Sequence, residues 1–269
     1  MQIKDVTRFL ESLAPLSFQE SYDNSGLLTG DPNDAVTGIL VTLDCTEEII
    51  NEALQSGCNL IVAHHPILFK GLKKLTGSNY VERTIIEAIR HKIALYAIHT
   101  NLDNVKMGVN RKIAEKIGLS NLSILSPKKG ILSKLVTFAP KNAVSAVLDA
   151  LYHAGAGTIG NYSNCSFQVE GTGTFLPMEH ANPAIGEVGK PEQVEEIRLE
   201  VLVPSHMEKS VIQALKNSHP YEEVAYYLTP LSNTHQEVGS GMIGELETSL
   251  EPKEFLKCLK EKMEQLLAY

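Results

Sequence analysis

The fold of this chain is decided by Asn59-Leu60-Ile61-Val62-Ala63-His64-His65-Pro66, an apolar run that ends in two adjacent histidines. A continuous apolar run of this length is typical of a strand buried in a sheet. A second apolar run, residues 93–98, leads in the same way into His99-Thr100-Asn101-Leu102-Asp103. In open α/β sheets, functional sites gather at the carboxyl ends of the strands. We therefore expect the polar residues that follow these two runs to meet in one site.

The residue types at these strand ends indicate a metal site. Imidazole and carboxylate together suit zinc, iron, manganese or nickel better than magnesium or calcium, which prefer oxygen ligands. Adjacent histidines at one strand end, followed by a His-x3-Asp spacing at the next, favour metal binding over loops whose histidines only form hydrogen bonds. Adjacent side chains on an extended backbone point to opposite sides, so we expect His64 and His65 to face different metals. Asp103 can then complete one of the two sites.

Composition limits the classes of protein to which the chain can belong. With 269 residues, 43% hydrophobic and 21% charged, it resembles an ordinary globular protein of one large or two smaller domains. The formal net charge of −8 argues against nucleic acid or an anionic membrane as a partner. The chain shows no signal peptide, no membrane-length apolar stretch and no CxxC pair among its four cysteines. We therefore expect a cytoplasmic protein with free thiols.

Residues 1–125 show an alternation of helix and strand signals. This β-α-β-α-β order predicts an α/β domain with a parallel-type sheet flanked by helices. Its expected elements are a helix with a stripe from Val6 to Leu13, a strand at 38–44, a helix from Thr46 to Gly57, the strand into His64, a helix at 80–91, the strand into His99, and a helix at 110–117 that stops at Gly118.

The chain changes character after residue 119. Residues 120–130 are rich in Ser, Pro and Lys, which predicts a linker and a domain boundary. Residues 131–232 show strand-helix-strand twice, which predicts an inserted ferredoxin-like α+β domain. Residues 238–269 are expected to return to the α/β domain or to stand apart from both. This last segment comprises a glycine-flanked turn or short strand at 239–246 and a helix marked by Phe255, Leu259, Met263 and Leu266.

Several short motifs together resemble one family. In the first domain they are residues 23–27, 42–44, 63–66 and 99–103; in the inserted domain they are residues 171–175, 181–186, 195–200 and 219–223. These motifs resemble the dinuclear-metal-centre, hexameric proteins called NGG-interacting-factor-three-like proteins, or GTP cyclohydrolase 1 type 2 homologues. The inserted domain is similar to the nitrogen-regulator and copper-tolerance folds.

This resemblance implies a ligand set and a partner. It implies two divalent metal ions held by five residues, of which three map onto His64, His65 and Asp103. The other two, a His and a Glu, belong to a C-terminal half of roughly one hundred residues, which we expect this chain to lack. It also implies self-association into a homo-oligomer, a hexamer in similar members, and a small-molecule substrate that the sequence does not identify.

Three functions are compatible with these features. The first is a metal-dependent hydrolase of the cyclohydrolase or amidohydrolase type, because a pair of metals can lower the pKa of a shared water and clamp the reacting oxygens. The second is a metal-binding regulatory or scaffold protein without catalysis, for which the inserted domain and an incomplete site argue. The third is a fragment without function.

The remaining polar residues each have two interpretations. His99 either orients a metal ligand or only forms a structural hydrogen bond. Asp44 could approach the site, but we favour a contribution to the cap of the helix that begins at Thr46. Asp23 either lines the pocket or belongs to an ordinary turn. Lys73 could meet an anionic substrate, although a solvated surface lysine is the simpler interpretation, and we expect His180 and His219 to be structural.

Overall fold

The computed structural model describes residues 1–263, and the chain divides into two compact units. Unit 1 contains Met1–Pro127 and the segment that begins at Glu237, and unit 2 is Lys128–Gln236. Unit 2 is therefore inserted between two segments that belong to unit 1.

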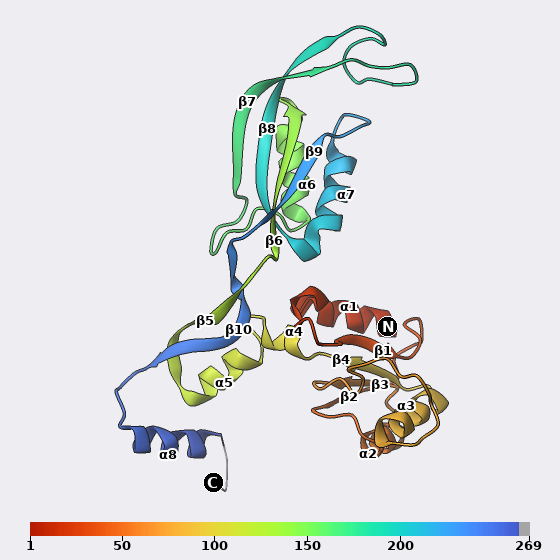
Figure 1. The fold of residues 1–269 in the computed structure, drawn as a ribbon, viewed down its shortest axis with the longest axis vertical. Helices are drawn as coiled ribbons and strands as arrows, with labels where there is room; N and C mark the ends of the chain where they lie inside the picture. Colours follow the sequence, from red (N-terminus) through yellow and green to blue (C-terminus); the bar gives the residue numbers. More distant parts are fainter. Residues whose placement is uncertain (264–269) are drawn as a thin grey trace. The chain divides into compact units, whose positions relative to one another are not determined.

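Unit 1 is built on a four-stranded sheet in the order β1-β4-β3-β2 (Figure 1). The three strands β2, β3 and β4 are parallel to one another. Strand β1 is an antiparallel edge strand that the sequence did not predict. The strands are β1 (Gly26–Thr29), β2 (Ile39–Thr42), β3 (Leu60–Ala63) and β4 (Ala94–Ala97). The helical segments are α1 (Ile3–Leu13), η1 (Leu16–Phe18), α2 (Glu47–Gln55), α3 (Tyr80–Arg90), α4 (Thr100–Asp103) and α5 (Val109–Ile117). The predicted α/β class with a flanked, parallel-type sheet is confirmed.

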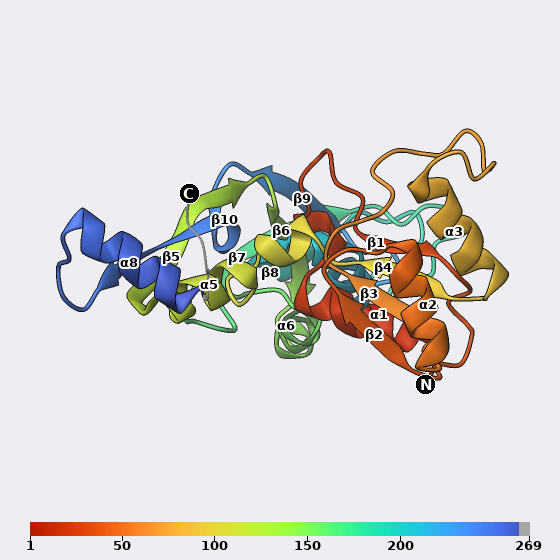
Figure 2. The same ribbon diagram turned by 90° about the horizontal axis from the view of Figure 1, so that it is seen from below.

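Helices cover both faces of this sheet and give it two cores. Helices α2 and α3 lie side by side on one face, as Figure 2 also shows. There Ile50 and Ile85 pack with Ile61, which points to that face from β3. Helix α1 lies on the opposite face, where Ile3 packs with Tyr96. Since both faces are covered, every residue of β3 and β4 is buried, which explains their unbroken apolar sequences.

Local sequence signals place the ends of the helices. The Thr46 side chain accepts a hydrogen bond from the backbone N–H of Ile49, and the Asn79 side chain accepts one from Glu82. Gly118 ends α5 in the left-handed conformation with φ of 89°, which glycine adopts without steric cost. The predicted caps at Thr46 and Gly118 are both confirmed.

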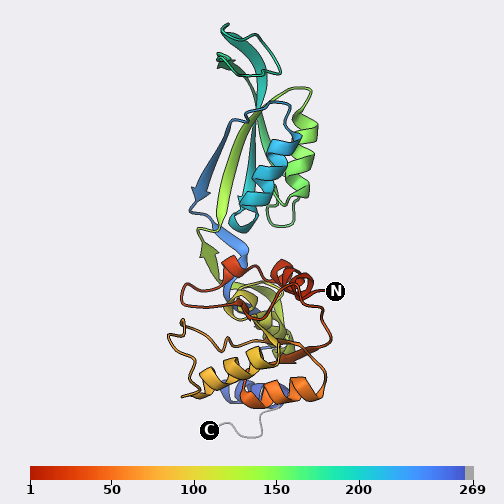
Figure 3. The ribbon, with the colours of Figure 1, turned by 90° about the vertical axis from the view of Figure 1, so that its right-hand side faces the viewer.

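Unit 2 has the predicted ferredoxin-like plan. Its sheet has the order β7-β8-β6-β9, and the neighbouring strands are antiparallel. Helices α6 and α7 pack against one face of this sheet (Figure 3). Leu135, Leu151 and Leu215 are fully buried there. The elements are β6 (Leu132–Pro140), α6 (Val144–His153), β7 (Ser166–Phe175), β8 (Glu192–Pro204), η2 (Ser205–Met207), α7 (Glu208–Ser218) and β9 (Tyr226–Leu231).

The segment predicted as a linker is a strand, and this part of the prediction is wrong. Strand β5 (Leu119–Lys129) pairs with β10 (Thr234–Leu246) in a two-stranded sheet. The pairing needs a close approach of the two backbones, because a Cβ at Gly239 would collide with the Ser126 carbonyl oxygen. Helix α8 (Pro252–Lys262) then follows as predicted, although Leu266 lies outside the described residues. Within residues 1–263, no helix is long and apolar enough to cross a membrane.

A single carboxylate organises the turn before α3. Glu82 accepts hydrogen bonds from the backbone N–H groups of Thr76 (2.8 Å) and Ser78 (3.1 Å). It also accepts from the hydroxyls of the same two residues and from the Asn79 side chain. The backbone hydrogen bonds, from Thr76 first and then from Ser78, lower the pKa of Glu82 to about 2. The ionised carboxylate therefore holds this turn closed.

Replacing Glu82 with glutamine should lower the free energy of unfolding in a pH-dependent way. Because the folded-state pKa lies below the ordinary value of 4.5, the stabilisation is full above about pH 5 and is lost as the pH falls towards 2. Urea unfolding of both proteins from pH 7 to pH 3 measures this difference. A wild-type advantage that stays constant as the pH falls would contradict the assignment.

Candidate metal centre

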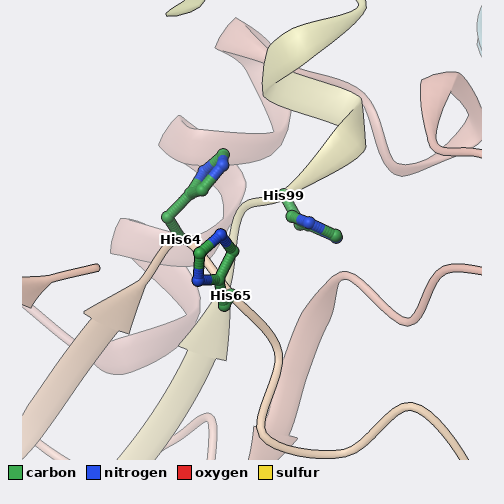
Figure 4. A group of neighbouring side chains, drawn as sticks. All are labelled: His64, His65 and His99. Carbon is green, nitrogen blue, oxygen red and sulfur yellow. The ribbon is translucent and has the colours of Figure 1, made fainter. Parts of the chain in front are cut away.

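Three histidines meet where β3 and β4 end. The two strands are paired in register, with Ala63 opposite Ala97, so they end at the same level of the sheet. His64 and His65 follow β3 and His99 follows β4 (Figure 4). The ring centroids are 5.0 Å apart for His64 and His65, 5.2 Å for His64 and His99, and 5.5 Å for His65 and His99. One nitrogen of each ring lies within 4.8 Å of the other two, a spacing that suits a shared metal ion.

The expectation that His64 and His65 point to opposite sides is wrong. It assumed an extended backbone, but the chain bends directly after β3. In this bend the backbone N–H groups of His64 and His65 donate to the carbonyl oxygens of Thr42 (3.1 Å) and Leu43 (2.9 Å). The bend therefore brings the two rings to the same side of the sheet edge.

Each imidazole is held through its Nδ1 atom. His64 Nδ1 lies 2.9 Å from the Ile98 carbonyl oxygen, His65 Nδ1 lies 2.8 Å from Asp44 Oδ1, and His99 Nδ1 lies 2.9 Å from Asp23 Oδ1. All three partners are acceptors, so each Nδ1 carries the proton of the neutral ring. The lone pair is then on Nε2, which is the arrangement that orients histidines as metal ligands.

Asp103 reaches the cluster from α4, the single helical turn that follows His99. Its Oδ1 lies 3.8 Å from His64 Nε2. Two buried asparagines fix this turn: Asn101 donates to the Ala14 carbonyl oxygen (2.7 Å), and Asn104 donates to that of Phe18 (2.8 Å). Ser240 of β10 donates in turn to Asn104 Oδ1 (2.8 Å), so the returning segment also supports the turn that presents Asp103.

Asp23 is the most constrained carboxylate in this region. Its side chain is fully buried and accepts hydrogen bonds from His99, from the hydroxyl and N–H of Thr100, and from the N–H of Asn24. Burial alone would raise its pKa, but the hydrogen bonds, led by the Thr100 hydroxyl and His99, lower the pKa to about 2. Asp23 is therefore ionised at neutral pH and holds His99 in place.

The structure resolves several alternatives that the sequence left open. His99 belongs to the histidine cluster, and the sequence signal was already there, since it follows its strand as His64 does. The favoured interpretation of Asp44 as a helix cap is wrong, because Thr46 caps α2 while Asp44 pairs with His65. His219 is structural, since Nε2 bonds the Phe138 carbonyl oxygen and Nδ1 accepts from the N–H of Tyr221.

Other reactive groups near the strand ends are less suited to metal binding. Burial raises the pKa of the Cys45 thiol to about 11, so this residue stays protonated at neutral pH and is a poor ligand. Lys70, Lys73 and Lys74 are exposed on the loop between the cluster and α3. Phe69, at the start of that loop, places its ring edge-to-face with His99 at 5.9 Å.

Comparison with known proteins places this chain in a family. The sequence profile of Duf34/NIF3 (NGG1p interacting factor 3) matches residues 1–268. The chain belongs to the Duf34/NIF3 family. The resemblance inferred from the motifs is thereby confirmed.

Relatives of this Duf34/NIF3 chain align with nearly its whole length. Proteins named GTP cyclohydrolase 1 type 2 homolog are 41% identical over 262 residues in Bacillus subtilis and 38% identical over 263 residues in Staphylococcus aureus. These matches cover 97% and 98% of this chain and 70% and 71% of the relatives. The crystal structure of a Bacillus cereus protein related to NIF3 aligns with a TM-score of 0.85 at 39% identity, covering 98% of this chain and 71% of that one.

Replacing Asp23 with asparagine should weaken metal binding without removing any of the three imidazoles. An amide cannot supply the charged acceptor that orients His99, and loss of such a partner typically lowers metal affinity about 10- to 100-fold. Competition with a chromogenic chelator for Zn²⁺ measures the change. The control is Asp149→Asn, which removes an exposed carboxylate in unit 2. Equal affinities of the two variants would show that Asp23 does not position a metal ligand.

Proposed function

We propose that this Duf34/NIF3 chain binds divalent metal through His64, His65 and Asp103, with His99 as a further ligand, and that the centre serves a metal-dependent hydrolase. The reaction would be of the cyclohydrolase or amidohydrolase type. The observation that carries this proposal is the convergence of three imidazoles, with one nitrogen of each ring within 4.8 Å of the other two and each Nδ1 bonded to an acceptor.

The donor set fits a divalent transition metal. Three imidazoles and a nearby carboxylate match the preferences of zinc, iron, manganese or nickel. Three carboxylates, Asp23, Asp44 and Asp103, each lie within 4 Å of one histidine nitrogen, so the surroundings are anionic and offset the charge of a cation. Unlike a closed structural zinc site, the cluster is partly exposed, which leaves room for a substrate.

A bound metal of this class would supply a water of lowered pKa and polarise a substrate oxygen. The protein residues keep the ligands in place around that chemistry. Asp23, Asp44 and the Ile98 carbonyl oxygen fix the three ring orientations, and α4 holds Asp103 beside His64. Phe69 lies edge-to-face with His99 and so borders the cluster.

Two finer features are part of the same proposal. We propose two metal ions per centre, on the resemblance to the dinuclear family. We also propose self-association of the chain, up to a hexamer, and the edge strand β2 supports this. Its side chains Ile39 and Val41 are exposed, and so is Leu43 just beyond it, so a second copy could cover an apolar edge.

A metal-binding regulatory protein is the second candidate. It is favoured by unit 2, which has a complete fold and a cavity of its own, as a ligand-sensing module would. The two functions differ in turnover, because a regulatory centre would bind metal without hydrolysing a substrate.

The first experiment is metal analysis of the purified full chain by mass spectrometry after loading with Zn²⁺ or Mn²⁺. We expect up to two metals per chain, and their loss in the double variant His64→Ala/Asp103→Ala. The matched control is His153→Ala/Asp149→Ala, which removes the same two residue types from the exposed surface of α6 and should keep the metal. Equal metal content in all three proteins would contradict the assigned centre.

Turnover separates the two candidate functions. The metal-loaded chain is assayed with GTP and with a panel of cyclic amides, beside the double variant. Hydrolysis that requires His64 and Asp103 supports the hydrolase, whereas retained metal without turnover on any of these compounds favours the regulatory protein.

Replacing Val41 with lysine should reduce self-association, because a charge on an exposed edge strand opposes pairing with a second copy. Light scattering of the wild type and the variant measures the mass in solution. Met107→Lys, at another exposed apolar position, is the control. A wild-type mass of a single chain, or a variant mass equal to that of the wild type, would contradict association through β2.

A further inference from the structure

Unit 2 contains a cavity of about 740 Å³ that plays no part in the histidine cluster. All its lining residues belong to unit 2, and they come from the sheet, from the loop after β7 and from the segment before β9. Small-molecule sites in proteins typically enclose roughly 300–1,000 Å³. The cavity is therefore large enough for a drug-sized or metabolite-sized molecule.

Aromatic side chains form part of the cavity wall. Phe138 and Tyr227 come from neighbouring strands and meet edge-to-face, with ring centroids 6.0 Å apart. Phe175 at the end of β7 and Met178 and Ile185 from the following loop add apolar surface. Although Tyr227 lines this cavity, 62% of its surface is exposed. A large exposed aromatic face of this kind favours contact with an apolar or cationic group.

The charges around the cavity are mostly negative. Four glutamates line it, Glu170, Glu196, Glu222 and Glu223, beside one guanidinium, that of Arg198. Arg198 pairs with Glu200, with 2.7 Å between Nη2 and Oε1, and Glu170 pairs with Lys141, with 3.1 Å between Oε1 and Nζ, so Glu196, Glu222 and Glu223 carry the excess negative charge. An anionic ligand would therefore meet net repulsion, whereas a cation would be attracted.

One of these carboxylates, that of Glu196, lies over a glycine of the neighbouring strand. Glu196 on β8 lies against Gly173 of β7, where any Cβ would collide with Oε2 of the glutamate. The Tyr221 hydroxyl is buried near this carboxylate, and burial first, then Glu196, raises its pKa to about 12. His219 forms hydrogen bonds with the Phe138 carbonyl oxygen and the Tyr221 N–H. These bonds fix the positions of Phe138 and Tyr221 in the cavity wall before a ligand binds.

The carboxylates of this cavity are not arranged for a metal ion. A metal site needs at least three His, Cys, Asp or Glu side chains whose ligand atoms lie close together. Within residues 1–263, such a group, with ligand atoms within 4.8 Å of one another, occurs at the histidine cluster of unit 1 and not at this cavity. The glutamates thus surround the cavity without converging on one point, which suits a larger ligand with a spread of contacts.

We propose that this cavity binds a small organic cation with an aromatic or apolar body, its amine facing Glu196 and its body against Phe138 and Tyr227. Such a ligand combines the cation–π and charge-assisted contacts that the wall offers. The site is independent of the proposed metal centre, and its test does not depend on turnover.

Tryptamine is the probe, and indole-3-acetate is its anionic counterpart with the same indole ring. The chain has no tryptophan, so indole fluorescence anisotropy, excited beyond tyrosine absorption, reports only the probe. The titration uses the full chain after treatment with a chelator, which removes any contribution from the histidine cluster. We expect saturable binding of tryptamine and at least tenfold weaker binding of indole-3-acetate.

Two variants locate the binding. Glu196→Gln should weaken tryptamine binding about tenfold or more, whereas Glu195→Gln, an exposed neighbour that alternates to the other face of β8, should leave it unchanged. Gly171→Phe should block the cavity, because a Cβ at Gly171 meets nothing within 4 Å and a ring there has free space to fill.

The outcomes divide clearly. Binding that prefers tryptamine and is lost in Glu196→Gln and Gly171→Phe, but not in Glu195→Gln, supports the proposal. No saturable binding by about 1 mM, equal binding of both probes, or equal affinity of the two glutamine variants overturns it. The proposal is also overturned if tryptamine does not bind and the Gly171→Phe variant has a lower mass than the wild type by light scattering. That result would assign this face to contact with a second copy of the chain.

Discussion

The parallel pairing of β3 with β4 is the constraint on which the rest of unit 1 depends. Both strands are buried on both faces, so their register cannot slip without exposing apolar side chains. With Ala63 opposite Ala97, the two strands end together, and the residues that follow them must share the same edge of the sheet. The apolar cores on the two faces therefore position His64, His65 and His99, although none of these histidines contributes to either core.

Hydrogen-bond acceptors next to the three histidines fix the orientation of each ring. Acceptors from three different segments take the three Nδ1 atoms, namely Asp44 after β2, the Ile98 carbonyl oxygen after β4, and Asp23 before β1. The low pKa of Asp23 shows that its hydrogen bonds stabilise the ionised form more than burial disfavours it. Rings held in this way lose little further freedom on binding a ligand, which favours binding.

In unit 2, the elements that form the core also position the residues of the cavity. Its helices cover one face of the sheet and complete a core, and the other face remains available. The loop after β7 and the segment before β9 then enclose part of that face as a cavity with aromatic walls and carboxylates. Buried His219 fixes the positions of Phe138 and Tyr221 and is thus a structural residue with a consequence for binding.

The sequence by itself determined the class of each unit, most helix ends and the residues that follow the decisive strands. Apolar periodicity and capping act over a few neighbouring residues, so Thr46 and Gly118 could be assigned correctly from the sequence. Only the tertiary structure decided that residues 119–129 pair with β10, that β1 is an edge strand, that Asp44 serves His65, and that the two adjacent histidines converge. Each of these depends on partners distant in sequence or on a bend set by long-range backbone hydrogen bonds, and local patterns carry no information about either.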